Sequence, residues 1–145
     1  MKLFISIIVM FTALLSLAEM ENHPVVEKVE EINTLRETLV KGVSGTTQVT
    51  PPVFKAVCKP VGMRAKAIAK ENGWKFRQAS EKYRNPNHKP TALELEAIKR
   101  FEKESLTSFF ETDKSGNRHY FRRITVQKAC LACHGPKDKR PEFIK

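Results

Sequence analysis

The sequence predicts an α+β fold, with helices in the first half of the chain and a small antiparallel sheet near its end. Two observations lead to this prediction. Apolar residues recur at three- and four-residue steps in three segments, which is the period of an amphipathic helix. Near the C-terminus, two segments rich in aromatic and β-branched residues flank a turn, which is typical of a β-hairpin. The chain has 145 residues and no internal repeat, so we expect one domain.

Residues 1–18 have the features of a secretory signal peptide. They contain one lysine, an apolar run of about fifteen residues and the small-x-small pattern Ser16-Leu17-Ala18. Such a run is shorter than the roughly 20 residues that a membrane-spanning helix needs. We therefore predict cleavage after Ala18 and export to the periplasm or another exported compartment. The remaining residues 19–145 are expected to form the single domain, without a stable membrane span.

The composition is strongly basic. The chain has 26 Lys and Arg against 16 Asp and Glu, which gives a formal net charge of +10 at pH 7. Cleavage removes Lys2 and no acid, which leaves +9. A basic surface favours docking to acidic proteins or anionic surfaces. We expect no nucleic acid partner, because exported chains rarely meet nucleic acid and the basic residues are scattered. A solvated basic surface is the simpler alternative.

Two helices are predicted in the first half of the domain. The first runs from about Pro24 to Gly42, where apolar residues recur at helical spacing between charged ones. The segment VSGTTQVTPP is expected to be a linker. The second helix follows and ends at Asn72-Gly73. Pro60 lies inside it, so we expect the helix to kink or to begin anew there.

The second half is predicted to contain a strand, a loop, a third helix and the hairpin. WKFRQASEKY has strand-like aromatics, and RNPNHKP follows as an irregular loop. Thr91, with Glu94 three positions later, is expected to cap a helix that carries Leu95, Ile98 and Phe101. The hairpin strands are LTSFFET and HYFRRITVQ, on either side of DKSGN.

Two cysteines and a histidine follow the predicted hairpin in the segment CLACH, from Cys130 to His134. This C-x-x-C-H pattern is the signature of covalent c-type haem attachment. The two thiols can add to the two vinyl groups of one haem, and the adjacent imidazole then reaches the iron. We predict one haem c, bound through Cys130 and Cys133, with His134 as the proximal iron ligand. The signal peptide supports this prediction, because haem is attached in exported compartments.

Three other kinds of site could use the same residues. A thioredoxin-like redox pair should open a helix within a βαβ unit, whereas this pair follows a hairpin near the chain end. A zinc site built from the three cysteines and His134 has suitable ligand types, but Cys133 and His134 are adjacent and fit one tetrahedral ion poorly. A disulfide between Cys130 and Cys133 would close a very small loop and stabilise little.

The residues leave the second axial ligand of the iron open. The side-chain candidates are Cys58, Met63, His88 and His119, beside a lysine, water or an open position. His23 is set aside, because it is expected to lie in a mobile N-terminus. Met63 is expected more often to fill the core, and His119 to be a solvated surface residue.

Cys58 needs its own explanation, because it is left over once Cys130 and Cys133 hold the haem. One interpretation is a small buried hydrophobe among apolar neighbours. The other is a thiolate bound to ferric iron, with the helix irregularity at Pro60 freeing the sulfur to point at the metal. The residues alone favour neither interpretation over the other.

Several segments resemble a known family: AVCKPVGMRAKAIAKENGWKFRQASEKYRNPNHKPTALELEAIKRFE, followed by FFET, YFRRITV and CLACHG. They are similar to segments of small bacterial mono-haem c-type proteins with a PAS-like fold, and the similarity covers residues 25–136. The resemblance implies a PAS-like antiparallel sheet with flanking helices, one haem, and axial ligation by His134 and Cys58. Arg77 or Arg84 could lie near the haem propionates, or their loop could be a structural turn.

These features predict an exported mono-haem c-type cytochrome that transfers single electrons at low potential to an acidic redox partner. The low potential follows because an anionic thiolate stabilises ferric over ferrous iron. The alternative is a haem-based redox or gas sensor that acts through a partner protein. No enzyme is expected, because a peroxidase would need an open iron and a distal acid–base group such as His88. The sequence sets no oligomeric state.

Overall fold

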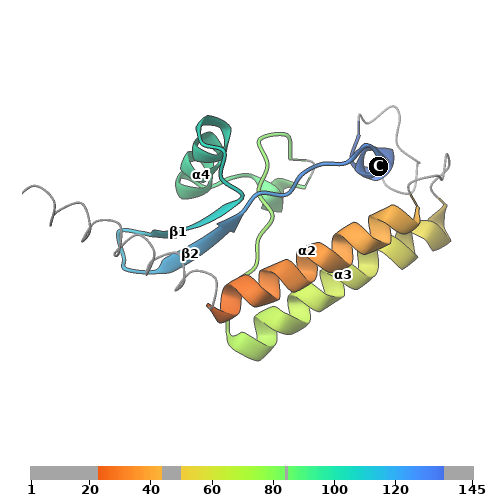
Figure 1. Cartoon of the computed structure of the whole chain (residues 1–145), viewed down its shortest axis with the longest axis horizontal. Coiled ribbons are helices and arrows are strands. Elements are labelled where there is room, and N and C mark those ends of the chain that lie inside the picture. Colours follow the sequence, from red (N-terminus) through yellow and green to blue (C-terminus); the bar gives the residue numbers. More distant parts are fainter. Residues whose placement is uncertain (1–22, 44–49, 84, 136–145) are drawn as a thin grey trace, which may run out of the picture.

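The computed structural model describes residues 23–43, 50–83 and 85–135 (Figure 1). The predicted signal peptide lies outside the described residues. Along the chain the elements are α2 (Pro24–Gly42), α3 (Pro51–Asn72), the 3-10 helix η1 (Pro86–His88), α4 (Ala92–Lys103), β1 (Ser108–Thr112), β2 (Arg118–Arg122), the 3-10 helix η2 (Lys128–Cys130) and α5 (Leu131–His134). The predicted α+β class is confirmed, with one two-stranded antiparallel sheet in the described part of the chain.

Helix α2 begins and ends where the sequence predicts. Pro24 occupies the first turn, where the missing amide hydrogen is not needed. The side chain of His23 caps the helix, because its Nδ1 accepts a hydrogen bond from the Val25 amide at 3.2 Å. The ring of His23 also packs against Phe110, with 5.1 Å between the ring centroids. The expectation that His23 is mobile is therefore wrong.

Helix α3 runs antiparallel to α2 along one side of the molecule (Figure 1). Its first two residues are Pro51 and Pro52, which the sequence analysis assigned to the linker. Amides of the first turn have no acceptor within the helix, so prolines are tolerated there. The helix continues through Pro60, so it does not begin anew at that residue. It ends at Gly73, whose left-handed φ of 67° suits glycine, as predicted.

The predicted strand WKFRQASEKY is wrong. Residues 74–80 are irregular, and a turn follows them. A strand needs a neighbour that exchanges backbone hydrogen bonds with it, and none of the described strands pairs with this segment. Its backbone bonds go elsewhere: the Trp74 amide donates to the Ala69 carbonyl and the Ser80 amide to the His88 carbonyl. Aromatic content alone therefore predicted the wrong local structure here.

The RNPNHKP loop and α4 follow the sequence prediction. The loop is irregular apart from η1, and Arg84 lies outside the described residues. Thr91 and Glu94 form the predicted capping box: the Glu94 amide donates to Thr91 Oγ1 at 3.3 Å and the Thr91 amide to Glu94 Oε2 at 2.7 Å. This box fixes the start of α4.

The β1–β2 hairpin lies between α4 and the α2–α3 pair (Figure 1). Successive strand residues point to opposite faces. Phe109 packs against Phe101 of α4, with 4.9 Å between the ring centroids. The neighbouring Phe110 packs against His23, at the start of α2. The hairpin thus forms the middle of three layers.

The buried core is small. Among the described residues the apolar side chains that are buried are Val40, Ile68, Ala97 and Phe109, of which Ile68 is fully buried. The described helices include none that is both long and apolar enough to cross a membrane. One ion pair, Arg64 with Glu31, joins α3 to α2, and another, Arg122 with Glu30, joins the hairpin to α2.

Candidate functional site

The C-x-x-C-H segment forms a short helical turn at the end of the described chain. Cys130 ends η2, and α5 continues directly through His134. Positions three and four residues apart lie on one side of a helical turn, which suits the two cysteines and the histidine of the motif. Cys130 is half-buried and His134 is exposed; the side chain of Cys133 lies outside the described part. Gly135 follows, and a Cβ there would clash with the Leu131 carbonyl oxygen.

The extended segment 123–127 carries this turn away from the hairpin and along α2. Arg122, at the end of β2, binds Glu30 through Nε and Nη2. Three residues later, the Thr125 carbonyl accepts a hydrogen bond from Arg36 at 3.5 Å. Three residues of extended chain span about 10 Å and six residues of helix about 9 Å. The segment therefore runs alongside α2, toward the end of the pair where α2 ends and α3 begins (Figure 1).

Cys58 lies at that same end of the helix pair. Arg64 of α3 donates to Glu31 of α2 at 2.6 Å. Cys58 precedes Arg64 by six residues on α3. Because the helices are antiparallel, Cys58 lies level with the residue of α2 six positions after Glu31, which is Glu37. That position is next to Arg36, which binds the extended segment. The structure thus brings Cys58 and the C-x-x-C-H segment toward one region, although they are far apart in the sequence.

The ion pairs that arrange these elements are charged at neutral pH. The hydrogen bond to Glu30 raises the pKa of the Arg122 guanidinium. The hydrogen bond from Arg64 lowers the pKa of the Glu31 carboxyl. Sequence reasoning missed these residues, because each pair joins positions more than thirty residues apart.

Two positions near Cys58 on α3 are small, whereas Phe54, four residues before it on the same flank, is a large aromatic residue. Gly62 and Ala65 follow at four and seven residues, on the same flank of the helix as Cys58. A Cβ placed on Gly62 would have nothing within 4 Å among the described residues. Cys58 itself is half-buried, at the edge of the inward-facing stripe that contains Ile68. The spacing of these small residues is visible in the sequence, but only a continuous helix places them on the same flank as Cys58.

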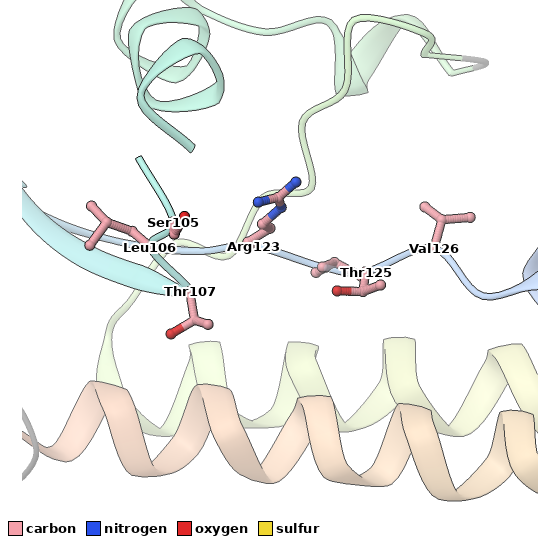
Figure 2. A pocket seen from close by; sticks show the side chains of 7 residues that line it. Ser105, Leu106, Thr107, Arg123, Thr125 and Val126 are labelled. Carbon is pink, nitrogen blue, oxygen red and sulfur yellow. The ribbon is translucent and has the colours of Figure 1, made fainter. Parts of the chain in front are cut away.

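Exposed apolar side chains lie within the C-x-x-C-H segment and just before it. Ile124, Val126 and Leu131 are 45%, 64% and 50% exposed. The first two also line an open cavity of about 520 Å³ together with Ser105, Leu106, Thr107, Arg123 and Thr125. Figure 2 shows Thr107 pointing toward the α2–α3 pair, whereas Arg123 and Val126 point away from it.

The other sequence candidates for the iron lie elsewhere or have other contacts. Met63 is 60% exposed and lies about 140° around α3 from Cys58, so its interpretation as core filler is wrong. His119 Nε2 lies 2.9 Å from Asp113 Oδ2 in the hairpin. His88 is half-buried in η1, where its backbone bonds to Ser80 and Asn85.

Arg77 has a structural role in the described loop. Its Nε donates to Glu94 Oε1 at 2.8 Å, and its Nη2 donates to the Lys89 carbonyl at 2.7 Å. These bonds tie the irregular segment to the start of α4. They favour the structural interpretation of Arg77 over contact with a propionate.

The described side chains include no group of three or more His, Cys, Asp or Glu arranged to hold a metal ion. By sequence, the segment formed by η2 and α5 contains two cysteines and a histidine. That set fits covalent haem, which is held by thioether bonds and one imidazole and needs no cage of protein ligands.

Comparison with known proteins gives one match. A family model described as Tll0287-like matches residues 14–145. The search of curated proteins and the search of solved structures each found no match.

Proposed function

The chain belongs to the Tll0287-like family, and we propose that it is an exported mono-haem c-type protein that transfers single electrons at low potential. The observation that carries the proposal is the C-x-x-C-H turn of η2 and α5, at the same end of the molecule as Cys58. In this proposal Cys130 and Cys133 form thioether bonds to one haem, and His134 is the proximal ligand. Bound haem would supply an iron that takes up and releases one electron.

The surroundings of the turn support haem attachment. Leu131, between the two cysteines, is half exposed, and Ile124 and Val126 lie just before the turn. A large apolar group held at α5 would cover part of this surface, and burial of apolar surface stabilises by about 25 cal/mol per Å². These side chains support attachment only; Val126 points away from the α2–α3 pair (Figure 2) and has no bearing on Cys58.

Cys58 is the proposed distal ligand. Cys58 is half-buried, and a Cβ on Gly62, four residues later on the same flank of α3, would meet nothing within 4 Å among the described residues. As a thiolate, Cys58 would stabilise ferric over ferrous iron, hence the low potential. Among the other candidates, His23 caps α2, His119 contacts Asp113 and Met63 lies on the outer side of α3.

A haem-based sensor is the second candidate function. The observation that favours it is Pro60 inside α3, two residues after Cys58. Proline has no amide hydrogen, so the Ala56 carbonyl loses its helical donor, and the turn that carries Cys58 is held by fewer bonds. Such a turn could release the sulfur on reduction, and the thiolate would then take up a proton. A partner protein would read that change.

The test is the absorption and electron-resonance spectrum of the haem-loaded protein, compared with that of the Cys58→Ser variant. We expect the ferric wild-type spectrum to be low-spin with thiolate character, and the variant to lose that character while haem stays covalently bound. Met63→Leu is the matched control on the same helix and should leave the spectrum unchanged. An unchanged spectrum in Cys58→Ser would show that thiolate ligation is wrong.

Carrier and sensor separate in a second experiment. The haem-loaded protein is titrated with reductant and then with CO, while the absorption spectrum is recorded. A carrier should keep both axial protein ligands in both oxidation states and bind CO poorly. A sensor should exchange one ligand on reduction and bind CO readily.

A further inference from the structure

We propose that the outer side of α3 is a docking surface for an acidic partner protein. The surface, called here the lysine face, consists of Lys55, Lys59, Lys66 and Lys70, all of which are exposed. The inference rests on the proposed function only where it takes the partner to be a redox protein; docking itself is independent of haem.

The four lysines form one row. They are spaced by four, seven and four residues, so they fall within an arc of about 60° at 100° per residue. The row is about 22 Å long at 1.5 Å per residue. It lies roughly opposite the buried stripe of α3 that contains Ile68. The lysine face is therefore a straight positive ridge on the outer surface of the helix.

The charge of this row is not neutralised within the described part of the chain. None of the ion pairs found there involves the four lysines. Glu71, the one acidic residue of α3, lies at least about 100° around the helix from the row. It approaches Arg64 instead, at 4.0 Å.

Several arginines, like Lys28 but unlike the lysines of the row, pair with glutamates. Arg64, Arg77, Arg100 and Arg122 each bind a glutamate of another segment of the chain. The lysines of the row are instead free to face a partner. The row is thus a group of exposed lysines on one helix, unpaired within the described residues, beside other exposed lysines such as Lys99 and Lys103 on α4.

Midway along the lysine face, a glycine and an exposed methionine flank the row. Gly62 and Met63 lie between Lys59 and Lys66, and Met63 is 60% exposed. Protein interfaces combine an apolar centre, in which Met is enriched, with a polar rim. A single exposed Met is too little for a helix that inserts into a lipid interface, which needs a broad apolar side. The chemistry therefore favours an acidic protein over a membrane surface.

The lysine face also lies close to the proposed haem ligand. Cys58 is about 90° around α3 from the centre of the row, and a helix is about 10 Å in diameter. A partner docked on the row would lie within about one helix width of the sulfur. This proximity suits electron transfer to the iron.

The test uses the haem-loaded protein and two charge-reversal pairs of equal net charge. Lys59→Glu/Lys66→Glu alters the lysine face, and Lys99→Glu/Lys103→Glu alters exposed lysines of α4. The readouts are anisotropy of a labelled poly-glutamate peptide and the rate of electron transfer from an acidic ferredoxin, each at low and high salt. Lys59→Gln/Lys66→Gln serves as a milder variant if the reversal disturbs folding.

We expect the lysine-face reversal to weaken both readouts at least about tenfold at low salt, with the difference vanishing at high salt. The α4 reversal should change them less than about threefold. Equal losses in both variants, or no loss in either, would overturn the proposal. A third outcome would also overturn it: the lysine-face reversal weakens binding to anionic phospholipid vesicles but changes neither peptide binding nor electron transfer. If the lysine-face reversal weakens peptide binding but the wild-type protein transfers no electrons, the docking surface stands and only the proposed function is refuted.

Discussion

Asp113 organises the hairpin turn through a single carboxylate. Its Oδ1 accepts the amides of Ser115 and Asn117, each at 2.9 Å. Its Oδ2 lies 3.0 Å from Asn117 Nδ2 and 2.9 Å from His119 Nε2. These hydrogen bonds, first of all the one from His119, hold the pKa of Asp113 well below its usual range. Gly116, with φ of 83°, completes the turn at a position where other residues would be strained.

The stability of the hairpin should therefore depend on pH. The folded carboxyl binds its proton less tightly than the unfolded one, so its contribution is present above the ordinary pKa of about 4 and is lost as the pH falls below it. We expect Asp113→Ala to unfold at a lower temperature than wild type at pH 7. The difference should shrink steadily from pH 4 toward pH 2. If the difference in unfolding temperature between wild type and Asp113→Ala does not change with pH, the charge of Asp113 does not contribute to the stability of the hairpin.

At the scale of single elements, α3 is the informative case. Its start at Pro51 and its end at Gly73 follow ordinary helix-capping chemistry. Its continuity through Pro60 does not, because proline inside a helix removes a hydrogen bond and disturbs the preceding turn. Packing against α2 compensates for that cost, with the Arg64–Glu31 bond and the buried Ile68 on the inward side.

Pro60→Ala should strengthen α3 in the haem-free protein. The new amide can donate to the Ala56 carbonyl, so we expect the free energy of unfolding to rise by up to about 3 kcal/mol. Urea denaturation followed by circular dichroism measures the change. Pro51→Ala is the control, since an amide at the first helical position has no acceptor within the helix. Equal effects of the two substitutions would contradict the explanation.

At the scale of the whole molecule, the three layers enclose little apolar surface. The four buried apolar side chains described lie in α2, α3, α4 and β1, so each layer contributes at most two. Near α5 the described chain leaves Ile124, Val126 and Leu131 exposed. A bound haem would complete this end of the molecule.

Loss of haem should therefore destabilise the fold. Covering three half-exposed apolar side chains contributes about 2–4 kcal/mol, which corresponds to roughly 6–20 °C in the unfolding temperature of a domain of this size. We expect Cys130→Ser/Cys133→Ser, which cannot attach haem, to show at least this loss by calorimetry. Cys58→Ser, which keeps covalent haem, should lose less. Equal unfolding temperatures for the haem-free variant and the wild type would contradict the proposed site.

Local chemistry in the sequence was enough for much of the structure. The bounds of α2, the Thr91–Glu94 capping box, the Gly73 helix end and the hairpin all depend on neighbours a few residues apart. The same holds for the C-x-x-C-H motif and its proposed haem. The strand predicted at residues 74–80 is wrong, because a strand needs a paired neighbour and the local sequence pattern does not show whether one exists.

The relation between Cys58 and the C-x-x-C-H segment required the folded chain. It depends on ion pairs between distant positions, Arg64 with Glu31 and Arg122 with Glu30, which set the register of α3 and of the extended segment along α2. Likewise the four lysines are scattered in the sequence and form one row only on the surface of a packed helix. Local patterns encode the elements and the C-x-x-C-H motif, whereas long-range packing sets which side of each element faces outward.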